Sequence, residues 1–528
     1  MPKLAPIVLV LLFVGVGGFA GAEEIPAEPV IDSIEIHNFN IYDTSNPEYR
    51  HWIFSLANRL HIPTRKLVIK RELLLDKGDR FNRDLAEETA HNLRTLSFIW
   101  NARTELVGGA DGSNILRVST VDRWSLSGGP SIDRSSGETT YKIGALEANF
   151  LGFGQTVAFD YFFRDYDEDY YVAWFYDRRI FGRKLSLNLF ANDDPEIGTK
   201  SITLSRPYYS LTSNHTFSID FTGYDYRNDH YREGIIVGRE WIEGSKVSLS
   251  GARRWGTYHT KVYFGAGYTY ADLEDMDTVV YYDGADVVFA LDSVYHYGEL
   301  FIGFQDIRYI KANRIDMFTR DEDITIIKGL TFLYGRTWET GSGARMHDVR
   351  GVSGNYGFYY RSNLILLEGF ARRWFHHDKT IRKKLDILAK YYNNALSWYT
   401  LAVHVRHARD TRLDGQKELY LGENKGIRGY PRNYSNGEKY LVVNVENRFF
   451  TNVRFPGGRI SPVQFIDLGS TWNRGEYFDV RHMEWSVGIG LRISTERLTS
   501  RESARIDVAY AGRLKTWQVS FGLGQYLN

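Results

Sequence analysis

Residues 155–163 read QTVAFDYFF, and this stretch carries the pattern that decides the fold. Its odd-numbered positions from 157 onward are apolar or aromatic, whereas Thr156 and Asp160 fall on the opposite face of an extended chain. The same alternation with a period of two recurs along the chain, at residues 185–189, 384–391, 399–406 and 485–492. Each segment is therefore predicted to be a β-strand with one apolar and one polar face.

The length of these segments favours a membrane barrel over a soluble sandwich. They run about nine to twelve residues with aromatic residues near their ends, as a tilted strand that crosses a bilayer requires. At about 25 residues per strand and connection, residues 123–528 would form about 16 strands, an even number. We therefore expect a mainly β fold, a transmembrane antiparallel β-barrel of about 16 strands.

The first 22 residues have the features of a secretory signal peptide. Lys3 precedes an apolar run over 7–13, and small residues occupy positions 20–22, which predicts cleavage before Glu23. The alternative is a retained membrane anchor, but this run is short of the roughly 20 residues that a membrane-spanning helix needs. The sequence thus predicts an exported protein.

Residues 30–122 lack the long alternating segments and predict a compact α+β domain on the periplasmic side of the barrel. Ile31 opens a strand, and an apolar stripe at helical spacing marks a helix over 49–60. Thr64 and Asn82 are candidate caps of two further helices. Two strands are predicted to follow, around 98–106 and 115–121.

Composition excludes several classes of function. The chain has no Cys, which excludes a disulfide framework, a Cys-ligated zinc site and a thiol nucleophile. Lys plus Arg (65) equals Asp plus Glu (65), so we expect no nucleic-acid partner. No GxSxG motif occurs, although a Ser/His hydrolase embedded in a barrel would not need one. We expect no enzyme activity and no cofactor.

Candidate metal ligands are weak. His404 and His407 stand three residues apart, so on a strand they point to opposite faces, and the pair His376 and His377 fits a rim position. The acidic runs 165–169 and 321–323 could bind a divalent cation, but solvated loops at the outer surface explain them better. We therefore expect no metal site.

Several short motifs together resemble one known family. The stretch 421–431 reads LGENKGIRGYP and contains Ile427, Arg428, Gly429 and Tyr430. Further matching stretches are NFLGFGQ at 149–155, VENR at 445–448, FIDLGSTW at 465–472, IKRELLLDKGDRF at 69–81 and LRTLSF at 93–98. With these motifs the chain resembles the BamA/TamA family of outer-membrane assembly and secretion barrels, which combine POTRA domains with a bacterial surface antigen barrel.

The resemblance implies a division into a signal peptide (1–22), one POTRA-like periplasmic domain (30–122) and an outer-membrane β-barrel (123–528). It also implies that the loop with Arg428 folds back into the barrel. Strand parity turns Glu446 and Asp467 toward the lumen, where a planar guanidinium can bind them. A solvated surface loop is the alternative.

The resemblance further implies insertion or translocation of other polypeptides at the outer membrane. The partners would be the lipid bilayer, unfolded outer-membrane or secreted client polypeptides, and periplasmic accessory proteins. A client strand would add to an edge of the POTRA-like sheet and then to the seam between the first and last barrel strands, near 124–131 and 517–527.

Two rival functions stay open. The first is a two-partner secretion transporter for one exoprotein, although residues 23–29 are too few for the plug helix such transporters carry. The second is a passive pore or structural barrel. The chain also departs from the family in its single POTRA-like domain, in the helical insert over 49–60 and in its ending, Tyr526-Leu527-Asn528.

Overall fold

The computed structural model describes residues 28–526 with internal gaps. The gaps fall at 136–137, 166, 233–234, 276–292, 317–320, 341–345, 413–418, 456–457, 496, 498–503 and 524–525. The predicted signal peptide, residues 1–22, lies outside the described residues.

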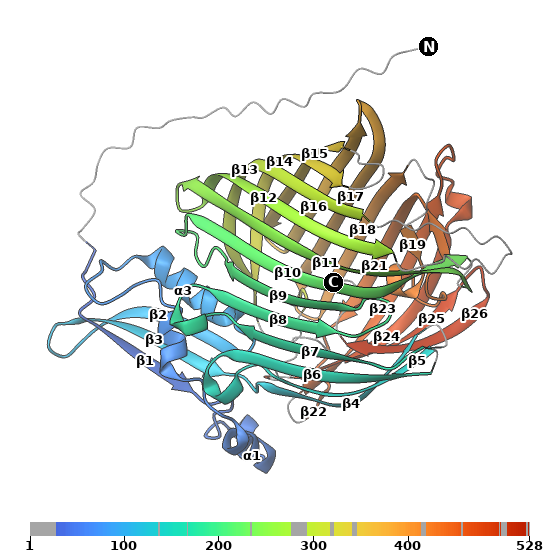
Figure 1. Ribbon diagram of the computed structural model, residues 1–528. Helices are drawn as coiled ribbons and strands as arrows, with labels where there is room; N and C mark the ends of the chain where they lie inside the picture. Colours follow the sequence, from blue (N-terminus) through green and yellow to red (C-terminus); the bar gives the residue numbers. More distant parts are fainter. Residues whose placement is uncertain are drawn as a thin grey trace.

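The greater part of the chain forms one closed antiparallel barrel (Figure 1). Its strands follow the chain in order around the wall, and β26 meets β4 to close it. The main strands are β4 (Leu126–Ser135), β5 (Glu138–Glu147), β6 (Gln155–Arg164), β7 (Tyr170–Asp177), β8 (Ser186–Asn192), β9 (Thr199–Arg206), β10 (His215–Arg232), β11 (Ile235–Gly256), β12 (Thr260–Asp275), β13 (Ser293–Asn313), β14 (Asp321–Thr340), β15 (Met346–Tyr360), β16 (Asn363–His376), β17 (Lys379–Leu396), β18 (Tyr399–Arg412), β21 (Lys439–Phe449), β23 (Gly458–Trp472), β24 (Glu484–Thr495), β25 (Ala504–Ala511) and β26 (Thr516–Leu523).

The prediction of about 16 strands is wrong. Within the described residues, twenty strands of at least seven residues form the wall, with the two-residue β22 (Arg454–Phe455) beside β23. The estimate allowed too many residues for each connection, because several hairpins turn on two residues only, at 361–362, 377–378 and 397–398. Strand length also varies more than expected, from seven residues in β8 to 22 in β11.

The predicted alternation of faces is confirmed. Four of the five segments that the sequence marked as strands lie within β6, β17, β18 and β24, and the fifth, 185–189, begins one residue before β8. Large apolar side chains are exposed on the outer face along the wall, among them Phe159, Leu249, Leu300, Phe332, Ile489 and Val519. A closed ring of such strands satisfies its backbone internally and places its apolar face against hydrocarbon, so this wall fits a membrane.

Residues 28–125 form a separate α+β unit, here called the N-terminal unit. Its sheet has the order β1 (Ser33–Phe39), β3 (Asn114–Asp122), β2 (Ile99–Gly108), with β1 parallel and β2 antiparallel to β3. The helices are α1 (Trp52–Leu60), α2 (Lys66–Arg71) and α3 (Arg83–Thr95). The core of this unit includes Ile31, Ile69, Leu93, Ile99, Leu116 and Val118. None of the helices in the described ranges is both long enough and apolar enough to cross a bilayer.

One of the two predicted helix caps is present. Asn82 accepts a hydrogen bond from the backbone N–H of Leu85 at 3.0 Å and caps α3. The cap assigned to Thr64 is wrong, because Arg65 is the N-cap residue of α2 and its side chain makes no capping bond. Thr64 instead donates its backbone N–H to Asp122 at 2.7 Å, at the point where β3 passes into the barrel.

The N-terminal unit contacts one end of the barrel, here called the near end, and the opposite end is the far end (Figure 1). It touches four successive hairpin turns, through Gly152, Arg179, Tyr209 and Tyr258. The prediction that residues 321–323 form a solvated outer loop is wrong. Asp323 lies at the near end and binds Arg94 of α3, with oxygen–nitrogen distances of 2.6 and 2.7 Å.

Candidate functional site

The connection between β18 and β21 enters the barrel from the far end. Its described part, residues 419–438, is here called the inward loop, and it contains β19 (Leu419–Leu421), η4 (Glu423–Lys425) and β20 (Ser435–Gly437). β19 and β20 pair as a small hairpin. Ile427, Arg428 and Tyr430 are at most 1% exposed, so the tip of the loop is buried in the lumen.

Arg428 binds two carboxylates from neighbouring wall strands. Its Nε and Nη2 donate to the two oxygens of Asp467 on β23, both at 2.8 Å. Its Nη1 donates to Glu446 on β21, also at 2.8 Å. Because Asp467 also accepts the backbone N–H of Arg428 at 3.2 Å, the loop is held through both its main chain and its side chain. Charge-assisted bonds of this bidentate kind are among the strongest in proteins.

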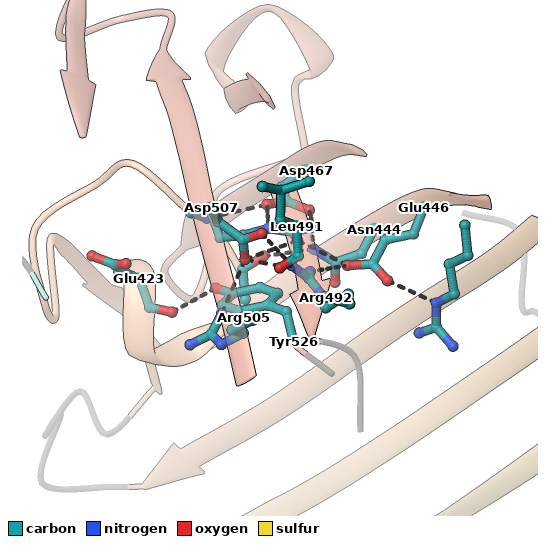
Figure 2. Close-up of polar contacts among 12 residues, drawn as sticks. Glu423, Asn444, Glu446, Asp467, Leu491, Arg492, Arg505, Asp507 and Tyr526 are labelled. Atoms are coloured by element: carbon teal, nitrogen blue, oxygen red, sulfur yellow. Dashed lines mark hydrogen bonds and ion pairs between the residues drawn. The ribbon is translucent and has the colours of Figure 1, made fainter. Parts of the chain in front are cut away.

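A larger network of charges surrounds this contact (Figure 2). Arg448 donates to the second oxygen of Glu446 at 3.0 Å, and Arg492 of β24 binds Asp507 of β25 at 2.5 Å. Asn444 donates to Asp467 and to the carbonyl of Gly426, both at 2.7 Å. The charged groups of the network are therefore paired, as full burial requires.

Two aromatic rings enclose the guanidinium of Arg428. The ring of Phe465 lies 3.5 Å from its Cζ atom and the ring of Tyr526 lies 4.2 Å from it. The Tyr526 hydroxyl donates to the carbonyl oxygen of Glu423 within the inward loop. Tyr526 therefore lies in the lumen and takes part in holding the loop (Figure 2).

The remaining motif residues give the loop its shape and packing. Gly429 adopts a φ of +85°, which favours glycine, and a Cβ there would lie 3.1 Å from the Cβ of Ala509. The Tyr430 hydroxyl donates to the carbonyl of Trp485 at 3.0 Å. Ile427 belongs to an apolar cluster that joins the loop to the wall, with Ala408, Leu421, Tyr430, Tyr440, Val442 and Ala511.

A second segment reaches the same network from the near end. The turn after β13 places the backbone carbonyl of Ile315 and the carboxylate of Asp316 against Arg448, the latter at 3.2 Å. Thr400 of β18 donates to the carbonyl of Arg314 in the same turn, at 2.9 Å. Arg448 and Glu446 thus connect a near-end turn with the inward loop across the lumen.

Charged pairs also fix the N-terminal unit to the near end. Glu72, at the end of α2, receives two bonds of 2.7 Å from Arg179 in the turn between β7 and β8. Glu88 of α3 accepts the backbone N–H of Leu211 at 2.6 Å and the hydroxyl of Tyr258 at 2.8 Å. Burial raises the pKa of the Glu88 carboxyl, and these two donors oppose the rise. The unit is therefore held by buried polar contacts.

The rings of His376 and His377 lie together at the turn after β16, with centroids 4.3 Å apart, whereas His404 and His407 point to opposite faces of β18. His404 faces the lumen and bonds to the Tyr392 hydroxyl at 2.8 Å, whereas His407 bonds to the carbonyl of Tyr440 at 2.9 Å. In the acidic run 165–169, Asp167 binds Arg227 at 2.6 Å. Within the described part of the chain, no three His, Cys, Asp or Glu side chains are placed to hold a metal ion.

The structure brings together all six residues that the sequence singled out, and it adds others. The strand parity that turns Glu446 toward the lumen also applies to Asn444 and Arg448, two residues to either side, and the alternation over 485–492 places Arg492 on the polar face. The same parity applied to residues 504–511 would have found Asp507. Nothing in the sequence pointed to Tyr526, because it lies beyond the last strand and strand parity does not apply to it; its ring contacts Arg428 only in the folded chain.

Comparisons with known proteins reveal a likeness in solved structures only. No family model matches the chain, and no curated protein matches it. The chain is similar to CdiB from Acinetobacter baumannii, with 12% identity and a TM-score of 0.45 over 94% of this chain and 74% of that one. CdiB from Escherichia coli gives 12% identity and a TM-score of 0.40, over 94% and 76%. BamA from Haemophilus ducreyi lacking POTRA domains 1-3 gives 12% and 0.37, over 93% and 83%.

Proposed function

We propose that this protein is an outer-membrane barrel that inserts or translocates other polypeptides, as the BamA/TamA resemblance implies. The observation that carries the proposal is the inward loop, whose Arg428 is fixed by Asp467 and Glu446 inside the lumen. Burial of a charged cluster of this kind costs desolvation energy. A barrel that only spans the membrane does not need such a cluster.

The N-terminal unit supports the same proposal as a POTRA-like periplasmic domain. Its sheet has β1 and β2 as its two edges, and an extended polypeptide can add to such an edge through main-chain hydrogen bonds. Its contacts with the near-end turns would hold that edge beside the barrel. The near end then faces the periplasm and the inward loop enters from the cell surface.

The closing strands provide a route for a client strand. β4 and β26 have ten and eight residues, whereas the strands of the opposite wall, β10 to β18, have 14 to 22. The neighbouring strands β5 to β9 and β25 are equally short, with seven to ten residues, so few ladder bonds hold this side of the wall. The seam is the junction of the first and last barrel strands on this side, and a client strand can pair there. An open edge in lipid would be costly unless a client occupied it.

A passive pore fits the lumen less well. The inward loop and the turn at 314–316 enter from opposite ends and meet through Glu446 and Arg448. A pore for small solutes has no use for a loop tip at most 1% exposed at its centre. A transporter for one secreted protein keeps the same architecture and remains the second candidate.

Depletion of the protein tests these functions against one another. Insertion predicts that several unrelated outer-membrane barrels fall in abundance together and that their precursors accumulate in the periplasm. Loss of a single secreted protein, with the other barrels intact, would favour the transporter. Unchanged membrane and secreted proteomes with altered uptake of small solutes would contradict the proposal. Complementation with wild-type protein provides the control.

A further inference from the structure

The helical insert α1 presents apolar side chains to its surroundings. Trp52, Leu56 and Leu60 follow one another at four-residue spacing on one face of the helix, and Ile53 lies beside them. These four side chains are 67%, 42%, 62% and 44% exposed, in that order. Such a stripe on a short helix is unusual in a protein surface that faces water alone.

The opposite face of α1 is firmly anchored at the base of the closing strands. Phe54 packs with Ile41 and Tyr42, and Trp124, two residues before the start of β4, joins the same cluster. Arg497, from the connection between β24 and β25, lies over the ring of Tyr49 at 4.9 Å. The exposed stripe is therefore held in a fixed orientation beside β4.

This stripe continues onto the rim of the membrane-facing wall. Arg65 donates its backbone N–H to the carbonyl of Gly152 at 3.1 Å, which joins the segment after α1 to the turn between β5 and β6. In that turn Phe150, Leu151 and Phe153 are exposed, as is Ile62 on the α1 side. The apolar outer face of the barrel and the exposed face of α1 thus meet at one rim.

Basic side chains flank the stripe, and the nearby carboxylate of Glu48 pairs with Arg454 at 3.6 Å. Arg59 lies on the edge of the exposed face, and Arg50 and Lys66 are exposed on either side of the helix. Long basic side chains beside an apolar stripe reach toward lipid headgroups while their stems cover apolar surface. Figure 1 shows α1 set apart from the sheet of the N-terminal unit, next to the near end of the wall.

We propose that α1 is an interfacial helix that inserts its exposed face into the near leaflet of the membrane, beside the seam, with anionic phospholipid as its ligand. The proposal needs the barrel to span the membrane but does not depend on its acting on polypeptides. In this arrangement the helix ties the N-terminal unit to the bilayer at the place where the barrel closes.

The test uses a fluorescent probe on the full chain, which is possible because the chain has no native Cys. Leu56→Cys and Ser55→Cys, each labelled with a polarity-sensitive dye, are reconstituted in vesicles of phosphatidylethanolamine and phosphatidylglycerol. Ser55 is the matched control, because it is exposed on the same helix outside the apolar stripe. We expect the Leu56 probe to be blue-shifted, quenched by nitroxide in the acyl region, and severalfold less accessible to aqueous iodide than the Ser55 probe.

Equal iodide quenching at both positions would overturn the proposal. So would a Leu56 probe that stays in water with vesicles alone and becomes shielded only when an unfolded barrel polypeptide is added, since the ligand would then be a client. Raising the phosphatidylglycerol fraction should increase the blue shift of the Leu56 probe. The increase should be smaller when the labelled chain also carries Arg59→Gln. A shift independent of phosphatidylglycerol in both would overturn the anionic preference. Retained gel mobility of the unboiled barrel shows in each case that the variant is folded.

Discussion

The lumenal cluster and the junction with the N-terminal unit use the same chemistry under different burial. In the lumen, the side chains of Arg428, Glu446 and Asp467 are 0% exposed, and Glu446 is shared with Arg448. At the junction, Arg94 and Asp323 keep 12% and 14% exposure, and Arg179 and Glu72 keep 7% and 2%. Removing one member of the cluster therefore disturbs all its neighbours, whereas a junction pair can fail by itself and leave the barrel intact.

Burial decides how much each contact is worth. A charged group that loses its partner in a buried, water-free site keeps its full desolvation cost. A charged group that loses its partner at the surface is hydrated by water instead. We therefore expect the effects of substitution to fall from the lumen to the junction and then to the outer surface. The following experiments order the contacts along this scale.

Arg428→Ala should have the largest effect. It leaves Asp467 and Glu446 without a shared cation and should destabilise the inward loop by about 3 kcal/mol. Urea unfolding of the barrel in vesicles measures the stability, and protease accessibility of the loop reports its position. A double-mutant cycle with Asp467→Asn should be strongly non-additive. Additive effects of the two substitutions would show that the contact does not hold the loop.

Glu72→Gln should loosen the N-terminal unit without unfolding the barrel. Arg179 would keep a neutral acceptor but lose its charged partner, at a cost of about 2 kcal/mol to docking of the unit. Hydrogen exchange at the amides of α2 and of the turn at 178–185 measures the change. Glu87→Gln is the matched control, because Glu87 is 68% exposed and, among the described residues, pairs along its own helix with Arg83. Equal exchange in both variants would contradict the role of the buried pair.

Tyr526→Ala should weaken the lumenal cluster less than loss of Arg428. The ring supplies one of two aromatic faces around the guanidinium, a contact worth about 1 kcal/mol. Tyr526→Phe keeps the ring and loses only the bond to Glu423, so it should fall between wild type and the alanine variant in urea unfolding. Identical behaviour of the alanine and phenylalanine variants would assign the effect to the hydrogen bond.

Arg336→Ala should have the smallest effect. Its partner Asp348 lies at 2.7 Å, but the two side chains are 49% and 31% exposed. An exposed pair contributes about 0.5 kcal/mol or less. Unfolding in urea should be almost unchanged, and added salt should alter it little. A loss as large as that of Arg428→Ala would mean that burial does not set the ranking.

Local pattern allowed the strands and their faces to be predicted, but not their number. Alternation over 155–163 marked β6 because side chains on a strand point to opposite faces whatever strand lies beside it. The predicted number of strands was wrong because it depends on the length of the connections. An average of about 25 residues per strand and connection is too large where a turn has two residues, as at 377–378. Thr64 was mistaken for a helix cap because Asp122, its actual partner, is 58 residues away.

The sequence alone determined the alternating strands, the outward apolar face and the inward parity of Glu446 and Asp467, because each depends on spacing along one segment. Only the tertiary structure decided which groups meet. Tyr526 contacts Arg428, 98 positions earlier in the chain, and Asp323 contacts Arg94 across 229 residues. Closure of the barrel sets both contacts, since it fixes which ends of the strands lie together, and this depends on the whole wall at once.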